Sequence, residues 1–335
     1  MEASVGVEEA GGHGAEAASP KFWSSHTAEL RRELAAMLPR GALRELHQLS
    51  PARHFLVAGC LFALMALIAW TLALLRRPSL WVPLALLQGI LLFDCTVLLH
   101  EALHRLVWLR RRERARGLLM WLYALPSGLS PSQFARWHLD HHAELGSATL
   151  DPKRHRLSPK RNARWLKLLY FTPGLFVIYF SAAARETATY PEALRRRVRR
   201  ERLACLALHA AALAAILWIG GSYALLRIYL VPYLVGFPLA FSLNRLGQHY
   251  DVDPCDPARW GTRMRRSPLW DRAFLWSGYH LEHHYFPGVP FYNLRRLNAL
   301  LAPFFEARGI PERSYGWLFW NYIGRNRPPH ASWEG

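Results

Sequence analysis

The sequence has few cysteines and none of the common motifs for binding a nucleotide. Its four cysteines are scattered, without a CxxC pair: Cys60, Cys95, Cys205 and Cys255. This spacing provides no disulfide framework, as is typical of a protein that faces a reducing compartment. The sequence also lacks a P-loop, a GxGxxG motif and an internal repeat, so it predicts no flavin- or nicotinamide-binding domain.

Acidic residues are scarce as well. The chain of 335 residues has 24 Asp and Glu against 42 Lys and Arg, which gives a formal net charge of +18. Such an excess can belong to a surface that binds nucleic acid. The arginine runs at 110–116 and 195–202, however, abut apolar segments and do not alternate with exposed aromatic residues. Contact with anionic lipid headgroups explains them more simply, and no nucleic-acid partner is predicted.

Long runs without charge are typical of an integral membrane protein. Hydrophobic residues make up 52% of the sequence, and residues 55–75 carry no charge. Residues 80–99 carry one acid, and the short linker before them predicts a hairpin of two helices. Residues 203–243 form another apolar stretch, which a Gly-Gly-Ser sequence at 220–222 interrupts. The sequence therefore predicts an all-α integral membrane protein with four transmembrane helices in two hairpins.

A fifth apolar run, residues 168–184, is shorter and contains Pro173 and Gly174. If it crossed the membrane, the histidine clusters described below would be divided by about 30 Å of hydrocarbon. We therefore expect this run to lie at the membrane interface, or to enter the membrane and return to the same side. Both arginine runs then fall on the side of the histidines, as the positive-inside rule expects for the cytoplasmic face. Arg76 and Arg77 fall on the other side and are the exception to this rule.

Three segments are expected along the chain. Residues 1–50 are predicted to be a disordered tail followed by interfacial amphipathic helices, residues 51–305 the membrane domain, and residues 306–335 a C-terminal cytosolic tail. The first twenty residues are rich in Ala, Gly and Glu and lack the regions of a secretory signal. Residues 27–49 space leucines among charges, with Pro39 as a break, which indicates helices at a membrane surface.

Nine of the sixteen histidines lie in three clusters and one single position, where an apolar stretch ends or in the polar segment that follows. Spacings of three and four residues put the imidazoles of each cluster on one face of a helix. Imidazole is a good ligand for iron, zinc and copper, and nine ligands exceed what one ion takes. The sequence thus predicts two metals and a cap rich in histidine, and it assigns no role to the other seven histidines. The predicted ligands and catalytic residues are His100 and His104 (HEALH), His138, His141 and His142 (HLDHH), His249 (GQHYD), and His280, His283 and His284 (HLEHH).

Acidic residues in and near the clusters are candidate partners for the imidazoles. A ligand set of neutral histidines leaves the metals strongly positive, and a carboxylate that accepts the second N–H of a histidine fixes its orientation. One of the acids, Asp94, would be costly inside an apolar span unless it faced the protein interior. A hydrogen bond from Asp94 to a neighbouring helix is an equal alternative. The candidates are Asp94, Glu101, Asp140, Asp251 and Glu282.

The three clusters, in this order around two apolar hairpins, resemble the histidine boxes of the membrane fatty acid desaturase superfamily. The most specific part is HHYFPGVP at 283–290, because HHxFPxxP follows the third box in many members. The resemblance covers residues 50–305 and implies that the nine histidines hold a di-iron centre on the cytoplasmic face. Members that act on acyl-CoA have a histidine like His249 and, four residues before it, an asparagine that holds a metal-bound water. Arg245 occupies that position here, so Asn244 and Gln248 are candidates for this role.

The resemblance implies an O2-dependent oxidoreductase that introduces a double bond into a fatty-acyl or related lipid chain. The sequence has no HPGG motif of a fused cytochrome b5, so a separate electron donor such as ferredoxin or cytochrome b5 is expected. A hydroxylase or ketolase acting on a lipid, sphingoid base, carotenoid or alkane is the alternative. The HxxHH second box favours a desaturase, because alkane hydroxylases tend to have HxxxHH. A non-catalytic membrane metal-binding protein is a third interpretation, but transporters place their ligands near mid-bilayer.

Overall fold

The computed structural model describes residues 21–108 and 112–328, which form helices joined by loops. None of these described residues belongs to a β-strand, so the predicted helical class is confirmed. The segment predicted as a disordered tail, residues 1–20, lies outside the described part of the chain, as do residues 109–111 and 329–335.

The first apolar hairpin consists of α4 (Pro51–Leu74) and α5 (Pro78–Leu103). Ser50 begins α4, since its hydroxyl accepts a hydrogen bond from the backbone N of Arg53 (3.4 Å), and proline follows at the first helical position. At 1.5 Å per residue the helices are about 36 and 39 Å long, enough to cross a bilayer core of about 30 Å. The most apolar window of α5 is 67% buried against 28% for α4, so α5 is the central helix.

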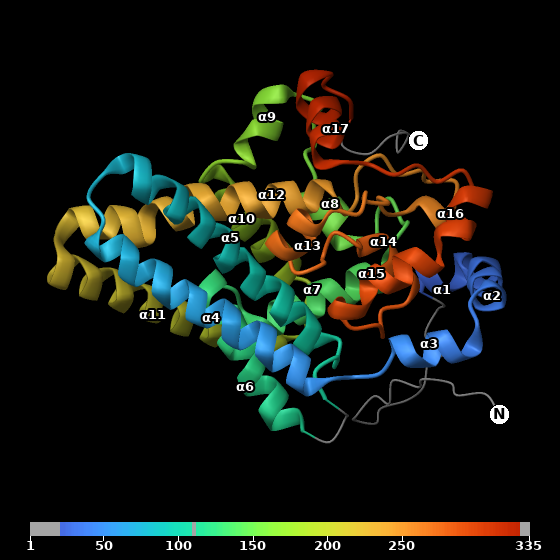
Figure 1. Ribbon diagram of the computed structural model, residues 1–335, viewed down its shortest axis with the longest axis horizontal. Coiled ribbons are helices and arrows are strands. Elements are labelled where there is room, and N and C mark those ends of the chain that lie inside the picture. The colour runs from blue at the N-terminus through green and yellow to red at the C-terminus, as the bar shows by residue number, and fades with distance from the viewer. Residues whose placement is uncertain (1–20, 109–111, 329–335) are drawn as a thin grey trace.

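Residues 192–246 are the third segment long and apolar enough to cross a membrane. They comprise α11 (Glu192–Leu225), the π-helical stretches η2 (Leu226–Leu230) and η3 (Pro232–Gly236), and α12 (Phe237–Leu246). The chain reverses at Gly221, whose φ of 71° lies in the left-handed region that glycine adopts readily. The two arms are then neighbours (Figure 1), and Nδ1 of His209 lies 2.6 Å from the hydroxyl of Tyr229. The membrane-length helices are confirmed, while the count of four crossings stays a prediction.

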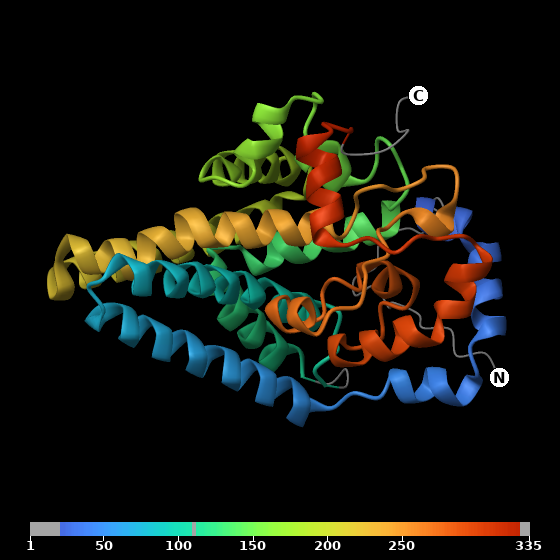
Figure 2. The ribbon, with the colours of Figure 1, turned by 45° about the horizontal axis from the view of Figure 1, so that its top comes forward.

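The two hairpins contact each other closely at a pair of glycines. A Cβ added to Gly89 of α5 would lie 2.4 Å from the backbone carbonyl carbon of Gly236, so a side chain here would force the helices apart. Both hairpin turns lie at the same end of the molecule (Figure 2). The close crossing therefore brings the C-terminal ends of α5 and α12, with the histidines that follow, to the opposite end.

The fifth apolar run forms α9 (Arg164–Leu169) and α10 (Gly174–Thr187). At 14 residues α10 is about 21 Å long, shorter than a bilayer core. It packs against α7 (Pro131–Glu144) and α8 (Pro152–Leu157). This length agrees with the expectation that the run does not cross the membrane.

The second and third histidine clusters lie on α7 and on α14 (His280–Tyr285), both at the end opposite the hairpin turns (Figure 1). Short helices and turns complete this end: α6 (Glu113–Ala124), η1 (Leu125–Ser127), η4 (Pro257–Arg259), α13 (Pro268–Ala273) and α15 (Phe291–Leu300). This cap of short elements surrounds the histidines with protein on several sides.

Segments from both ends of the chain pack onto the cap. They form α1 (Phe22–His26), α2 (Ala28–Met37), α3 (Arg40–Leu46), α16 (Ala302–Ala307), α17 (Tyr315–Phe319) and η5 (Trp320–Gly324). Leu34 of α2 and Leu318 of α17 are buried in the hydrophobic core. The apolar sides of these helices therefore pack against the protein itself. Their relation to a bilayer and the domain boundaries at residues 50 and 305 stay predictions.

Candidate metal centre

All nine predicted ligands converge in two groups. Within each group the ring nitrogens that could bind a metal lie within 4.8 Å of one another. The five other described histidines, at 26, 47, 54, 155 and 209, belong to neither group. The first group is His100, His104, His138, His142 and His283, and the second group is His141, His249, His280 and His284.

Helix geometry divides each HxxHH cluster between the two groups. On α7, His138 and His142 are four residues apart and face the first group, while His141 faces the second. On α14 the roles are reversed, because His280 and His284 face the second group and His283 the first. Residues four apart lie one above the other on a helix, and the residue between them is rotated away. The HxxHH spacing thus lets one helix serve two adjacent sites.

Two histidines of the second group have their tautomers fixed by neighbours. Nδ1 of His249 lies 3.1 Å from the carbonyl oxygen of Trp260, and a carbonyl can only accept, so this nitrogen carries the proton. Nδ1 of His141 lies 2.8 Å from Oδ1 of Asp151. That oxygen also accepts from the backbone N of Lys153 (3.0 Å), so it acts as an acceptor toward His141 too. In both neutral rings Nε2 is therefore the nitrogen with the lone pair.

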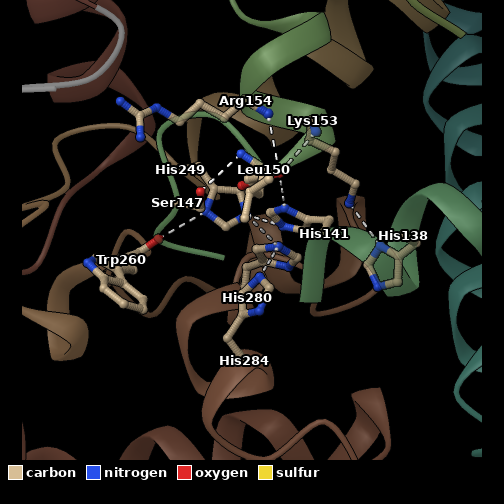
Figure 3. A network of polar contacts seen from close by, with 11 residues as sticks. His138, His141, Ser147, Leu150, Lys153, Arg154, His249, Trp260, His280 and His284 are labelled. Atoms are coloured by element: carbon tan, nitrogen blue, oxygen red, sulfur yellow. Dashed lines mark hydrogen bonds and ion pairs between the residues drawn. The ribbon is translucent and has the colours of Figure 1, made fainter. Parts of the chain in front are cut away.

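These two lone pairs face each other. Nε2 of His141 lies 3.0 Å from Nε2 of His249 (Figure 3), although neither nitrogen has a proton to donate. Similar contacts join Nε2 atoms of His280 and His249 (3.1 Å) and of His284 and His280 (3.0 Å). Lone pairs at this distance repel each other unless a cation lies among them. The donor set of the second group therefore fits a metal ion.

The spacing of the nitrogens also fits a metal. Metal–nitrogen bonds of about 2.1 Å at right angles put two ligand nitrogens about 3.0 Å apart, whereas tetrahedral bonds put them about 3.4 Å apart. The first group shows the shorter spacing as well, between Nε2 atoms of His104 and His138 (2.9 Å) and of His283 and His142 (3.1 Å). The histidines of each group would thus be close enough together to hold one ion.

Burial keeps the imidazoles neutral. It lowers the pKa of His138, His141, His280 and His283 well below the usual value of 6.5, with smaller contributions from nearby cations and histidines. Neutral imidazole is the form that binds metals. The site is therefore ready to take a cation at neutral pH without first losing protons.

The acids around the site differ from those that the sequence suggested. Glu101 lies near its own cluster, with Oε1 3.6 Å from Nδ1 of His100. Asp140 and Asp251 instead pair with arginines: Asp140 Oδ2 accepts from Arg136 and Asp251 Oδ2 from Arg313, both at 2.7 Å. Those two acids therefore do not orient an imidazole.

The remaining two candidate acids are buried without contacting a histidine. Glu282 accepts a hydrogen bond from Nδ2 of Asn298 (2.5 Å), and burial raises the pKa of Glu282 to about 7. Asp94 is 1% exposed, and its Oδ1 has no hydrogen-bond partner among the described residues. The acid that does orient a ligand is Asp151, which sequence reasoning missed. Its signal is the Asp-Pro pair at 151–152, typical of a helix start: its side chain caps α8.

A lysine that sequence reasoning also missed contacts the first group. Nζ of Lys153 lies 2.8 Å from Nδ1 of His138 (Figure 3). Burial, with a smaller contribution from Arg245, lowers the pKa of Lys153 to about 7. A ring that binds a metal through Nε2 carries its proton on Nδ1. In that state Nδ1 of His138 donates a hydrogen bond to Nζ of Lys153, and this nitrogen can accept it only when the lysine is a neutral amine.

An elongated cavity adjoins both groups. It is open in part to solvent. His100, His138, His280 and His283 line it, together with apolar side chains such as Phe93, Phe134 and Phe241 and several polar residues. Phe93 lies seven residues before His100 on α5, so the cavity runs about 10 Å along that helix. An apolar group can therefore lie directly beside the candidate metal site.

The polar candidates for a water ligand also line this cavity. Nδ2 of Asn244 donates to the hydroxyl of Ser277 (2.8 Å), and Nε2 of Gln248 donates to Oδ1 of Asn244 (2.7 Å). The two amides therefore form one network, and their role toward a metal-bound water stays a prediction.

Comparison with known proteins agrees with this geometry. The model of the fatty acid desaturase family matches residues 78–316, more than two thirds of the chain. A curated relative, the dihydrorhizobitoxine desaturase of Bradyrhizobium elkanii, is 34% identical over 94 residues. The aligned stretch covers 24% of this chain and 27% of that protein, so the chain spans about a quarter of the length of this relative.

Proposed function

Because this chain belongs to the fatty acid desaturase family, we propose that it is an O2-dependent di-iron desaturase that introduces a double bond into a fatty-acyl or related lipid chain. The observation that carries this proposal is the convergence of nine imidazoles in two groups beside an apolar cavity. Each group would hold one iron ion. When bound, the iron pair would supply O2 activation and the oxidising power to remove hydrogen from an unactivated methylene.

The overall reaction balances as a four-electron reduction of O2 to two waters. Two electrons and two hydrogens come from adjacent carbons of the substrate, where two C–H bonds break and a second C–C bond forms. The other two electrons come from a separate carrier, such as a ferredoxin or cytochrome b5, and two protons from solvent. The protein positions the two carbons and keeps water away from them.

Specific side chains would perform this positioning. Phe93, Val97, Phe134 and Phe241 line the cavity next to the histidines and would hold the apolar part of the substrate. Asp151 and the carbonyl of Trp260 would keep Nε2 of His141 and His249 free of protons, directed at the metal. The chain thus contributes orientation and an apolar site, while the metals contribute the oxidation.

We further propose the membrane topology that the sequence suggests. The two arms around Gly221 would be separate crossings, which gives four with α4 and α5. The histidine cap would then lie on the cytoplasmic face, with the arginine-rich start of α11 beside it. An electron carrier and O2 could reach the metals from the cytosol, and a lipid substrate from the bilayer.

The reaction type is tested by supplying 18O2 to the iron-loaded protein with an electron donor and analysing the modified lipid by mass spectrometry. A desaturase yields a product that has lost two hydrogens and carries no label. A hydroxylase or ketolase yields a product labelled with 18O at the attacked carbon, and that result would overturn the desaturase assignment while leaving the metal site unchanged. Iron-loaded protein that shows no turnover on any lipid supplied would instead favour the non-catalytic interpretation.

A further inference from the structure

Arg245 is the charged residue at the site to which the proposed function gives no role. It lies on α12, four residues before His249, and it lines the cavity beside the two groups of histidines, together with His138, His280 and Lys153. Arginine stays charged at all physiological pH values. A permanent cation therefore stands in the wall of the cavity that would hold the substrate.

Several other polar groups of this wall have partners within the protein. Asn244, Gln248 and Ser277 form the network described above. The hydroxyl of Thr96 donates to the carbonyl of Phe93 (2.7 Å), and Glu101 accepts from the backbone N of Phe291 (3.1 Å). These groups need nothing from a ligand.

Arg245 differs from them, because its guanidinium makes no hydrogen bond or ion pair with any of residues 21–108 and 112–328. Asp151 borders a smaller cavity that Arg245 also lines and attracts the guanidinium electrostatically, but no hydrogen bond or ion pair joins the two side chains, and Oδ1 of Asp151 accepts from His141 and from two backbone N–H groups. A charged group shielded from water without a partner is costly. The five donors of Arg245 are thus available to a bound molecule.

The charge around the cavity favours an anion. Glu101 is the single acid among its lining residues, and Lys153 borders it as an amine that is neutral when His138 binds a metal. Neutral histidine ligands would leave two iron ions uncompensated as well. The planar fork of a guanidinium matches the two oxygens of a carboxylate, which it binds through paired hydrogen bonds.

The rest of the cavity favours an apolar tail on the same molecule. The apolar residues of the wall include Phe93, Val97, Leu129 and Phe241. A second, smaller cavity shares Leu129 and Phe241 and continues to Phe176 and Phe237. Phe237 lies eight residues before Arg245, about 12 Å along the helix axis. A molecule with its carboxylate at Arg245 would extend its tail toward the membrane half of the protein.

We infer that the substrate is a free carboxylic acid whose carboxylate binds Arg245, so that the carbons oxidised lie near its carboxyl end. Arg245 and four of the histidines line one cavity, so a carboxylate bound to Arg245 would place the carbons nearest to it beside the candidate metal site. A thioester or amide of the same acid lacks the negative charge that this site would neutralise. Oxidation of the bound acid rests on the proposed function, whereas its binding to Arg245 does not.

Equilibrium binding tests the inference without turnover. The full-length, iron-loaded protein in detergent, kept without electron donor, is titrated with hexanoate, with hexanamide and with inorganic phosphate by calorimetry. Hexanoate and hexanamide share chain length and shape and differ in charge. We expect hexanoate to bind the wild-type protein at least about tenfold more tightly than hexanamide, and phosphate not to displace hexanoate.

Variants locate the site. Arg245→Gln is expected to remove the preference for hexanoate, Arg245→Lys to keep part of it, and the control Arg199→Gln, an exposed arginine of α11, to leave it unchanged. Equal binding of acid and amide by the wild-type protein would refute the inference even if no variant folds. An unchanged preference in Arg245→Gln, or displacement of hexanoate by phosphate, would overturn the assignment of a carboxylate site at Arg245. If the protein showed the expected preference for hexanoate but no desaturation in the 18O2 experiment, the proposed reaction would be wrong and the carboxylate site would stand.

Discussion

Replacing Asp151 by alanine is expected to weaken the binding of the metal in the second group of histidines by about ten- to hundredfold. Oδ1 of Asp151 accepts hydrogen bonds from Nδ1 of His141 (2.8 Å), the backbone N of Lys153 (3.0 Å) and the backbone N of Arg154 (3.4 Å). Without this oxygen the ring of His141 can rotate, and either ring nitrogen can carry the proton. A fraction of the rings would then present an N–H to the metal in place of a lone pair.

The same variant should also lose stability. Three hydrogen bonds to one oxygen, at about 1 kcal/mol each, give a loss of about 2–4 kcal/mol in the free energy of unfolding. Asp151→Asn keeps an acceptor oxygen of the same shape, so it should recover most of the stability and part of the metal affinity. The two variants therefore separate the effect of the hydrogen bonds from that of the negative charge.

The measurement is the iron content per chain and the affinity by competition with a chelator. Wild-type protein should hold two iron ions, and Asp151→Ala should retain about one at chelator concentrations that leave the wild type loaded. Asp140→Ala is the matched control, because Asp140 lies inside the same HLDHH sequence but pairs with the exposed Arg136, an interaction worth less than about 1 kcal/mol. If folded Asp151→Ala bound both ions with wild-type affinity, the tautomer argument would be wrong.

Three further outcomes follow from the arrangement of the histidines. His142→Ala and His284→Ala should each reduce the iron content toward one per chain by elemental analysis, and a substitution at an exposed histidine outside both groups should not. Burial lowers the pKa of imidazoles such as His284 in the folded state. Their contribution to stability is therefore full above about pH 6.5 and is lost as the pH falls toward the lowered values. Metal-free protein should accordingly show a lower unfolding temperature at pH 5.5 than at pH 7.5. In a variant without the exposed native cysteines, single cysteines that replace Arg112 or Arg197 should be labelled from one side of the membrane, and one that replaces Ser79 from the other side. Labelling of the first two positions from opposite sides would refute the four-crossing topology.

Much of the fold and the ligand set could be predicted because they depend on local sequence. Apolar runs of about twenty residues and a Gly-Gly-Ser break determine the helices and the reversal at Gly221. The spacing within each histidine cluster fixes which side chains share a helix face. The contact of Gly89 with Gly236 joins residues that are 147 positions apart, and no pattern within either helix indicates it.

The partners of the ligands were harder to predict, since they come from loops and from the backbone. Asp140 was a reasonable candidate because it lies next to His141, but consecutive residues of a helix point about 100° apart. It therefore faces Arg136 on the outer side, and the acid that contacts His141 comes from the loop after α7. The carbonyl of Trp260, which fixes His249, carries no sequence signal because every residue has one.

The division of each HxxHH cluster between the two groups also bears on the positive charge that bound metals would bring to the cavity. Because α7 and α14 each supply both groups, the groups must be adjacent. Seven of the nine imidazoles lie on α5, α7 and α14, His104 follows the end of α5, and His249 completes the second group. No carboxylate takes part in either group, so two bound cations would keep their charge within this shell. The acids nearest the ligands, Asp151 and Glu101, are engaged by donors of the protein. A carboxylate on the substrate, which we infer to bind Arg245, would balance part of this charge.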